Sequence, residues 1–298
     1  MGGKGKIFIT GEITTKAKIN VTEITKRVLS DVGYDTDYEV VDNLGKQSPD
    51  IALGTNEDVL GAGDNGMMFG YACRETNKYL PKAMVILQEL SEAYDKLRLS
   101  DSRYLPDGKA QITGYYEDNK LVKIKTFTVC YQNTEENRKS TDRKLIQIIE
   151  DICKKYDVLV EEYLINPTGK FLIGGFLGDA GLTGRKIVVD SYQSFANVGG
   201  GAFSGKDPTK VDRSGAYKAR EIAKDILVNN SEYEWCSVQL SYAIGIEEPL
   251  AIYIKTDKGD IEVSRELYQE CRPRNIIKDL DLRNICYEEK ARFGHFKN

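Results

Sequence analysis

The chain has very little histidine: His295 is the only one among 298 residues. A single imidazole excludes metal sites that need two histidines. Its position close to the end of the sequence argues against Ser-His or Cys-His nucleophilic catalysis, because we expect the terminus to fray. Any chemistry must therefore depend on carboxylates, lysines, arginines and bound metal.

Cysteine is also sparse, and its spacing carries no motif. None of the six cysteines forms a C-x-x-C pair with another. They are Cys73, Cys130, Cys153, Cys236, Cys271 and Cys286. In a chain of intracellular composition we expect free thiols rather than disulfide bridges or a zinc site.

The sequence lacks an apolar run long enough to span a membrane, and it lacks a signal-peptide pattern at Met1. We therefore expect a cytosolic protein.

The net charge of the chain is −4, with charges of both signs interspersed. This pattern excludes a general nucleic-acid or membrane surface and leaves only local positive fields. The 41% hydrophobic content is enough for a sizeable core, and the length alone suggests about two domains.

What the sequence does have is a stretch rich in glycine and charge, residues 199–213, which reads G-G-G-A-F-S-G-K-D-P-T-K-V-D-R. Glycine lets the backbone approach an anion closely, Lys206 and Lys210 offer charges to phosphate oxygens, and Asp212 can hold Mg²⁺. An amphipathic helix predicted at 213–229 places the stretch at a helix N-terminus, where anions are favoured. We predict a polyphosphate and metal site; the alternative is a flexible surface loop with solvated charges.

Two glycine motifs match nucleotide-binding patterns only formally. Residues 200–206 satisfy G-x-x-x-x-G-K, but Asp207 replaces the Ser/Thr hydroxyl and Pro208 follows, so we reject a P-loop. Residues 61–66 satisfy G-x-G-x-x-G, but no parallel strand precedes them and no βαβ unit surrounds them. We interpret this segment as a glycine-rich frame for Asp64.

The hydrophobic pattern predicts an α+β fold, in which antiparallel hairpins are backed by long helices and each sheet is covered on one face. We expect strands at 7–15, 38–41, 162–165, 171–173, 236–244 and 250–255, a hairpin at 110–129, and helices at 21–33, 77–100, 136–156, 213–229, 264–271 and 274–282. In the first helix, Ile24, Val28 and Leu29 should face inward. The passage 42–66 is rich in glycine, proline and asparagine and should be irregular.

Six segments together carry a resemblance to a known family. They are G-E-I-T-T-K (11–16), G-K-Q-S-P-D-I (45–51), G-A-G-D-N-G-M-M-F-G-Y-A (61–72), I-N-P-T-G (165–169), G-D-A-G-L-T-G-R-K (178–186) and G-G-G-A-F-S-G-K-D-P-T-K-V-D-R-S (199–214). With these segments the chain resembles the methionine adenosyltransferases, also called S-adenosylmethionine synthetases, over nearly its whole length. The resemblance implies transfer of the adenosyl group of ATP to the sulfur of methionine, with Mg²⁺ and K⁺ as cofactors and hydrolysis of the tripolyphosphate to phosphate and diphosphate.

The resemblance also implies an architecture and an assembly. The fold would consist of three similar α+β subdomains, at residues 1–60, 61–177 and 178–298, with the first one truncated. The active sites would lie between the subunits of a homodimer or tetramer. A full-length homologue is a further possible partner.

The resemblance assigns roles to individual residues. Glu12, Gln47 and Asp64 would face methionine; an outward-facing strand residue is the plain alternative for Glu12. The phosphates would be held by Lys109, Arg185, Lys186, Lys206 and Lys210, which are also the candidate catalytic groups. Asp107, Phe171 and Asp179 would contact the adenosine, and Asp212 would hold Mg²⁺.

The sequence departs from the family at several positions. The family opens with a G-H-P-D-K segment that supplies a catalytic histidine and a Mg²⁺ ligand, followed by a glutamate that binds K⁺, and this chain begins after them. Val198 stands where the family has a histidine before the triple glycine, and Gln193 departs from the D-T-Y-G-G segment. Two functions therefore stay open: an active methionine adenosyltransferase, or an impaired homologue that binds nucleotide or a full-length partner subunit and modulates it.

Overall fold

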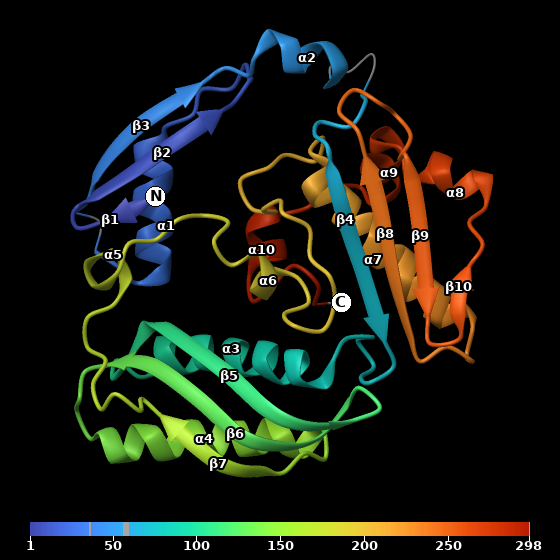
Figure 1. Ribbon diagram of the computed structural model, residues 1–298. Helices are drawn as coiled ribbons and strands as arrows, with labels where there is room; N and C mark the ends of the chain where they lie inside the picture. Colours follow the sequence, from blue (N-terminus) through green and yellow to red (C-terminus); the bar gives the residue numbers. More distant parts are fainter. Residues whose placement is uncertain (36, 56–59, 298) are drawn as a thin grey trace. The chain divides into compact units, whose positions relative to one another are not determined.

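The computed structural model describes residues 1–35, 37–55 and 60–297. The strands are β1 (Gly2–Gly3), β2 (Lys6–Glu12), β3 (Glu39–Gly45), β4 (Gly66–Cys73), β5 (Tyr104–Glu117), β6 (Lys120–Asn133), β7 (Val160–Ile165), β8 (Trp235–Tyr242), β9 (Ala251–Thr256) and β10 (Gly259–Ile261). The helices are α1 (Val21–Val32), α2 (Pro49–Thr55), α3 (Lys82–Ser100), α4 (Arg138–Lys155), α5 (Gly175–Gly178), α6 (Ile187–Asp190), α7 (Val211–Asn229), α8 (Arg265–Glu270), α9 (Pro273–Asp279) and α10 (Tyr287–Ala291) (Figure 1).

The chain divides into two compact units, each made from two separate stretches of sequence. Unit 1 contains Met1–Gln47 and Ile86–Leu182, and unit 2 contains Ser48–Val85 and Thr183–Asn298. Unit 1 holds two three-stranded sheets, β1-β2-β3 and β5-β6-β7, and unit 2 holds the sheet β10-β9-β8-β4. Most strand pairs are antiparallel and helices accompany the sheets, so the predicted α+β class is confirmed.

The two sheets of unit 1 are built in the same order. In each, two antiparallel strands are followed by a helix and then by a third strand that is parallel to the second: β1-β2-α1-β3 and β5-β6-α4-β7. A parallel neighbour requires a crossover connection, and α1 and α4 provide it. The prediction from hairpins alone did not include these parallel strands.

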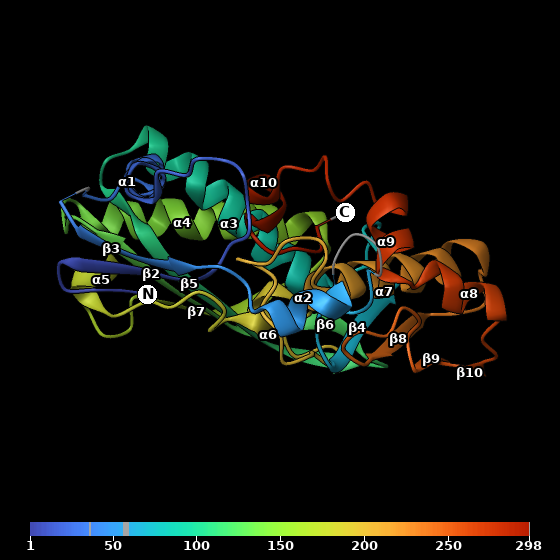
Figure 2. The ribbon, with the colours of Figure 1, turned by 90° about the horizontal axis from the view of Figure 1, so that it is seen from above.

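The sheet β5-β6-β7 is the better covered of the two. Its hairpin turns at Asp118 and Asn119, whose positive φ angles of 48° and 62° suit a two-residue turn that matches the strand twist. Helices α3 and α4 lie over the same face of this sheet (Figure 2). Phe127 of β6 and Leu145 and Ile149 of α4 are fully buried between the layers.

The sheet of unit 2 packs against α7. Buried and partly exposed residues alternate along β8, as expected for a sheet covered on one face. The approach is closest at Gly70 of β4, where a Cβ atom would lie only 2.0 Å from the carbonyl oxygen of Ala219. A glycine at this position is therefore needed for α7 to lie on β4.

Several predicted elements differ from the observed ones. Residues 171–173 do not form a strand, although the backbone of Asn133 donates a hydrogen bond to the carbonyl of Phe171 at 2.9 Å. Strand β4 was not predicted, because its two glycines weaken a strand pattern. The passage 42–66 is not uniformly irregular, since β3 extends into it and α2 lies within it; its residues 56–59 are outside the described residues.

The inward face predicted for the first helix is also only partly right. Leu29 is buried, but Ile24 and Val28 are 47% and 41% exposed. The three-stranded sheet beside α1 is too small to cover the whole apolar side of the helix. Unit 1 therefore presents apolar side chains to its surroundings at this helix.

Candidate functional site

The glycine-rich loop 199–213 leads into the N-terminus of α7, as the sequence predicts. Helix α7 begins at the fully buried Val211, and Lys210 is its N-cap residue. A Cβ atom on Gly199 would lie 2.4 Å from the carbonyl oxygen of Met67, so this end of the loop lies directly on β4. The loop is thus anchored at both ends, by β4 and by α7.

Asp212 and Lys206 form an ion pair within this loop. The ammonium nitrogen of Lys206 lies 2.7 Å from a carboxylate oxygen of Asp212, and the two side chains are 31% and 13% exposed. The carboxylate lies against Gly201, where a Cβ atom would be 1.8 Å from Oδ1 of Asp212. Gly201 therefore leaves the space that this carboxylate occupies.

The backbone around Lys206 is held by neighbouring side chains. The guanidinium of the buried Arg213 donates a hydrogen bond to the carbonyl of Lys206 at 2.9 Å and lies over the ring of Tyr287. Asp207 accepts hydrogen bonds from the backbone and the hydroxyl of Thr209 at 2.7 and 2.5 Å. These contacts order the loop, so the alternative of a purely flexible surface loop is not what the structure shows.

Lys210 lies beside the segment that contains Asp64. A Cβ atom on Gly63 would lie 3.3 Å from Cδ of Lys210, so the lysine stem packs closely against this glycine. Asp64 is exposed and accepts a hydrogen bond from the backbone of Asn65. Unit 2 thus places a candidate phosphate-binding lysine next to a candidate methionine-binding segment.

Arg185 and Lys186 are exposed at the surface of unit 2. Their neighbour Gly184 has a φ angle of +82°, and a Cβ atom there would lie 2.7 Å from the Cβ atom of Ala202. The backbone that carries Arg185 and Lys186 therefore runs next to the glycine-rich loop. Both residues are near the loop in sequence and in space. Neither side chain forms an ion pair with a carboxylate among the described residues.

His295 is not at a frayed end, contrary to our expectation. It is 1% exposed, and Nδ1 lies 2.6 Å from the hydroxyl of Tyr217. Nε2 lies 3.5 Å from the hydroxyl of Ser204, and the ring meets Phe203 edge to face. Burial, followed by the charges of Arg213, Lys290 and Lys297, lowers the pKa of His295 to about 4, so the imidazole is neutral at pH 7.

The C-terminal segment therefore supports the loop from within. Phe296 stacks on Tyr192 with ring centroids 4.7 Å apart, and the backbone of His295 donates a hydrogen bond to Asp190. Sequence reasoning missed this supporting role because a residue close to a terminus usually frays. The apolar residue Phe296 beside the histidine was the one available signal of burial.

In unit 1, Glu12 and Gln47 lie at the same end of a parallel strand pair. Glu12 is the last residue of β2 and pairs with Gly45 of β3, two positions before Gln47. The backbone of Gln47 donates a weak hydrogen bond to the hydroxyl of Thr14 at 3.4 Å. Glu12 is exposed, so this end of the strand pair presents a carboxylate to solvent.

The three candidate adenosine residues gather around the segment 171–180 of unit 1. Asp107 accepts a hydrogen bond from the backbone of Gly175 at 2.6 Å and a second one from the hydroxyl of Tyr34. Asp179 donates its backbone N–H to the carbonyl of Gly175 at 3.1 Å. Phe171 is held to β6, and the exposed Lys109 follows Asp107 on β5 by two positions.

The candidates thus form one group in unit 2 and two groups in unit 1. Unit 2 holds Asp64, Arg185, Lys186, Lys206, Lys210 and Asp212; unit 1 holds Glu12 with Gln47, and Asp107 with Phe171, Asp179 and Lys109. Each group brings together residues that are distant in sequence.

The residues of unit 2 fit a Mg²⁺ ion that is bound together with phosphate. Among the described residues, no three His, Cys, Asp or Glu side chains cluster as a complete metal site. Mg²⁺ is commonly held by one or two carboxylates, with substrate phosphates and water completing its shell. Asp212, beside bare glycine backbone and two lysines, is a donor of this type.

No helix in the described part of the chain has the length and apolar character needed to cross a membrane.

Comparison with known proteins extends the resemblance found in the sequence. Residues 59–171 match the family model described as S-adenosylmethionine synthetase, central domain, and residues 173–298 match the one described as the C-terminal domain. The S-adenosylmethionine synthase of Clostridium tetani is 42% identical over 324 residues, covering 98% of this chain and 82% of the relative. The synthase of Helicobacter pylori is 42% identical over 318 residues (98% and 81%), and that of a Picosynechococcus strain is 39% identical over 341 residues (98% and 82%).

Proposed function

Because the chain belongs to the S-adenosylmethionine synthetase family, we propose that it is a methionine adenosyltransferase that forms S-adenosylmethionine from ATP and methionine. The observation that carries this proposal is the ion pair of Lys206 and Asp212 at the N-terminus of α7, with Lys210 beside the Asp64 segment. This arrangement offers cations, a carboxylate and bare backbone at one place, as the transfer of a polyphosphate leaving group requires.

The reaction needs charge stabilisation more than a general base. A lone pair of the neutral methionine sulfur attacks C5′ of the ribose, the C5′–O bond breaks, and its electrons pass to the tripolyphosphate oxygen. Lys206 and Lys210, with Arg185 and Lys186 on the adjoining backbone, would neutralise the charge that develops there. A Mg²⁺ ion held by Asp212 would supply further electrostatic stabilisation of the phosphates.

The remaining candidates would bind the two substrates. We propose that Glu12, Gln47 and Asp64 contact methionine and that Asp107, Phe171 and Asp179 contact the adenosine, with Lys109 on the phosphates. Both carboxylate oxygens of Asp107 already have donors, Tyr34 and Gly175. Asp107 would therefore hold the 174–179 segment in place. The same carboxylate oxygens would also contact the nucleotide. The family resemblance adds K⁺ to the proposed cofactors.

The test is mass-spectrometric detection of S-adenosylmethionine after incubation of the purified chain with ATP, methionine, Mg²⁺ and K⁺. We expect product from the chain and none above background from Lys206→Ala, since this change removes the ammonium paired with Asp212. The matched control is Lys255→Ala, an exposed lysine on β9 of the same unit, which should retain activity.

Two results would contradict the proposal. One is equal turnover in Lys206→Ala and in the unchanged chain. The other is absence of product both alone and after addition of a full-length relative. If the chain gives no product but still binds a non-hydrolysable ATP analogue, the alternative of a binding homologue that modulates a partner subunit is favoured instead.

A further inference from the structure

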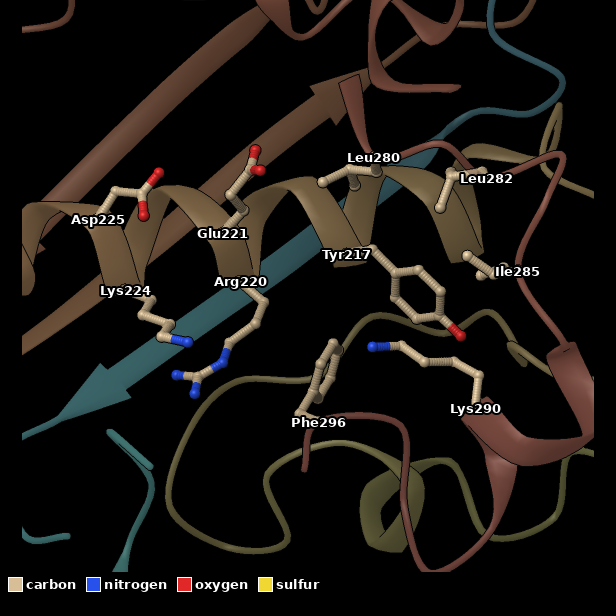
Figure 3. Close-up of a pocket in the computed structure, with 10 residues that line it drawn as sticks. All are labelled: Tyr217, Arg220, Glu221, Lys224, Asp225, Leu280, Leu282, Ile285, Lys290 and Phe296. Carbon is tan, nitrogen blue, oxygen red and sulfur yellow. The ribbon is translucent and has the colours of Figure 1, made fainter. Parts of the chain in front are cut away.

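Unit 2 contains a second charged cavity, further along α7 than the glycine-rich loop. Its volume is about 370 Å³, and none of the candidate site residues line it (Figure 3). Tyr217, Arg220 and Lys224 contribute from one face of α7, because residues three and four apart are neighbours on a helix. Lys290 contributes from α10 and Phe296 from the C-terminal segment.

Two lysines line this cavity without forming a close ion pair in the part of the chain that the structure describes. Among the described residues, no carboxylate lies within 4.0 Å of the ammonium group of Lys224 or Lys290. Lys290 lies over the ring of Tyr217, with its nitrogen 5.3 Å from the ring centroid. Burial lowers the pKa of Lys290, and the charges of Lys297, Arg220 and Lys224 lower it further. The cavity therefore brings together positive charges that repel one another.

Arg220 adds a fixed positive charge to the cavity wall. The residue is 5% exposed. Its guanidinium donates hydrogen bonds to the carbonyls of Tyr71 and Tyr79 at 2.7 and 2.9 Å and to that of Lys78 at 2.8 Å. Backbone carbonyls hold the group in place without cancelling its charge, and Nε has no hydrogen-bond partner among the described residues.

The two acidic residues of the cavity balance these cations only in part. Glu221 binds Lys218, with 2.7 Å between the charged atoms. In Figure 3, Glu221 and Asp225 project from a different side of α7 than Arg220 and Lys224. Burial raises the pKa of Asp225 and the neighbouring Glu221 raises it further, whereas the positive charges of Lys218 and Lys224 lower it. The region between Lys224, Arg220 and Lys290 is thus positive on balance.

We propose that this cavity is an anion site for a diphosphate group, bound by Lys290 and Lys224 as mobile cations and by Arg220 as a fixed one. Lysine ammonium groups bind phosphate oxygens as point charges, and a diphosphate can meet several of them at once. A cavity of this volume is within the range of sites for small ligands. The group could arrive as free inorganic diphosphate or as part of a nucleotide, and the site is independent of the proposed catalytic one.

Calorimetric titration with inorganic diphosphate and, separately, with ADP tests the proposal and distinguishes these sources. A Lys206→Met/Lys210→Met background removes the lysines of the glycine-rich loop, and the part of the remaining binding that depends on Lys224 and Lys290 reports the second cavity. We expect one diphosphate per chain in this background. Adding Lys224→Met and Lys290→Met should weaken it at least about tenfold, the effect of losing one charge-assisted hydrogen bond. Lys255→Met, the exposed control, should leave affinity unchanged.

A second measurement uses the chain without substitutions. Saturating diphosphate should slow the acylation of Lys290 by an N-hydroxysuccinimide ester at least about fivefold, because a lysine held by a charge-assisted bond is less available; Lys255 should react at its usual rate. Peptide mass spectrometry measures both lysines in one sample. Unchanged Lys290 acylation, or complete loss of diphosphate binding in Lys206→Met/Lys210→Met, would overturn the proposal.

Discussion

The position of Asp212, the candidate metal ligand, depends on the absence of a side chain at Gly201. A methyl group on Gly201 would occupy the place of the Asp212 carboxylate, 1.8 Å from Oδ1. We expect Gly201→Ala to rotate Asp212 away from Lys206 and to weaken binding of tripolyphosphate with Mg²⁺ about tenfold, the effect of one charge-assisted contact.

Gly200 provides the matched control, because a Cβ atom there meets nothing within 4 Å. Gly200→Ala should bind tripolyphosphate like the unchanged chain in calorimetric titration. Equal weakening by both substitutions would mean that loop flexibility, rather than space for Asp212, is the important property of the triple glycine.

His295 predicts a pH dependence of stability. Its pKa is lowered to about 4 in the folded protein, against an ordinary value of about 6.5 in the unfolded chain. Between these values the unfolded chain binds more protons, so the free energy of unfolding falls as the pH decreases. The stabilisation is complete above pH ~6.5 and is lost toward pH ~4, and we expect a loss of roughly 1 to 2 kcal/mol between pH 7.5 and pH 5.

Urea unfolding at the two pH values measures this effect. His295→Asn keeps a polar partner for Tyr217 but does not titrate in this range, so its loss between pH 7.5 and pH 5 should be smaller by that amount. The comparison removes contributions from carboxyl groups common to both proteins. Parallel pH profiles of the two proteins would show that His295 does not titrate as described.

Among the secondary-structure elements, the packing of α7 on β4 depends on Gly70. Any larger residue at this position would push the helix away from the strand, since a Cβ atom would lie 2.0 Å from the carbonyl oxygen of Ala219. We expect Gly70→Ala to lower the free energy of unfolding by about 1 to 3 kcal/mol, as overpacking in a tight core does.

Thermal or urea unfolding followed by circular dichroism measures this loss. Gly45→Ala is the control, because it also replaces a strand glycine but meets nothing within 4 Å. A Gly70→Ala protein as stable as the control would indicate that α7 and β4 can separate without cost.

The long elements could be predicted from the sequence, and the short or glycine-rich ones could not. The α4 and α7 helices carry enough apolar residues at helical spacing to be recognised, and the β5-β6 hairpin has a clear two-residue turn. Strand β4 was missed because its Gly70 serves a contact with α7 that no local pattern reveals. The exposed face of α1 was misread, because the pattern does not tell how much sheet is available to cover it.

The candidate site was predictable in its composition but not in its geometry. The run of glycines and lysines indicated a polyphosphate site, and the pairing of Lys206 with Asp212 lies within a few positions of that run. The support from His295, Tyr217 and Phe296 comes from the far end of the sequence. Such long-range support depends on tertiary packing, which one sequence does not display.

For the whole molecule, we predict self-association through unit 1. Phe8, Ile13, Ile24 and Val28 are between 39% and 47% exposed, and apolar surface of this kind at one sheet and its helix is typical of an interface. The first strand and the passage 42–66, of which residues 42–47 belong to unit 1 and residues 56–59 lie outside the described residues, should lie at a dimer interface. Such an interface buries on the order of 2,000 Å² or more when it is obligate.

Sedimentation velocity at micromolar concentration tests the assembly, with a dimer expected. Ile24→Lys combined with Val28→Lys should shift the protein to monomer without unfolding it, because both side chains are already partly exposed. A monomer in the unchanged chain at these concentrations would rule out the interface.

The interleaving of the two units has a consequence for how the chain is made on the ribosome. Strand β4 emerges early, yet its neighbour in the sheet is β8, which is synthesised only after all of unit 1. During this interval the apolar strand G-M-M-F-G-Y-A-C has no edge to pair with, which is the condition under which nascent chains recruit chaperones or aggregate. Unit 1 can finish folding first, and the sheet of unit 2 must wait until β8, residues 235–242 of 298, has been synthesised. A chain whose synthesis ends before Trp235 would therefore have a folded unit 1 and an unpaired, aggregation-prone β4.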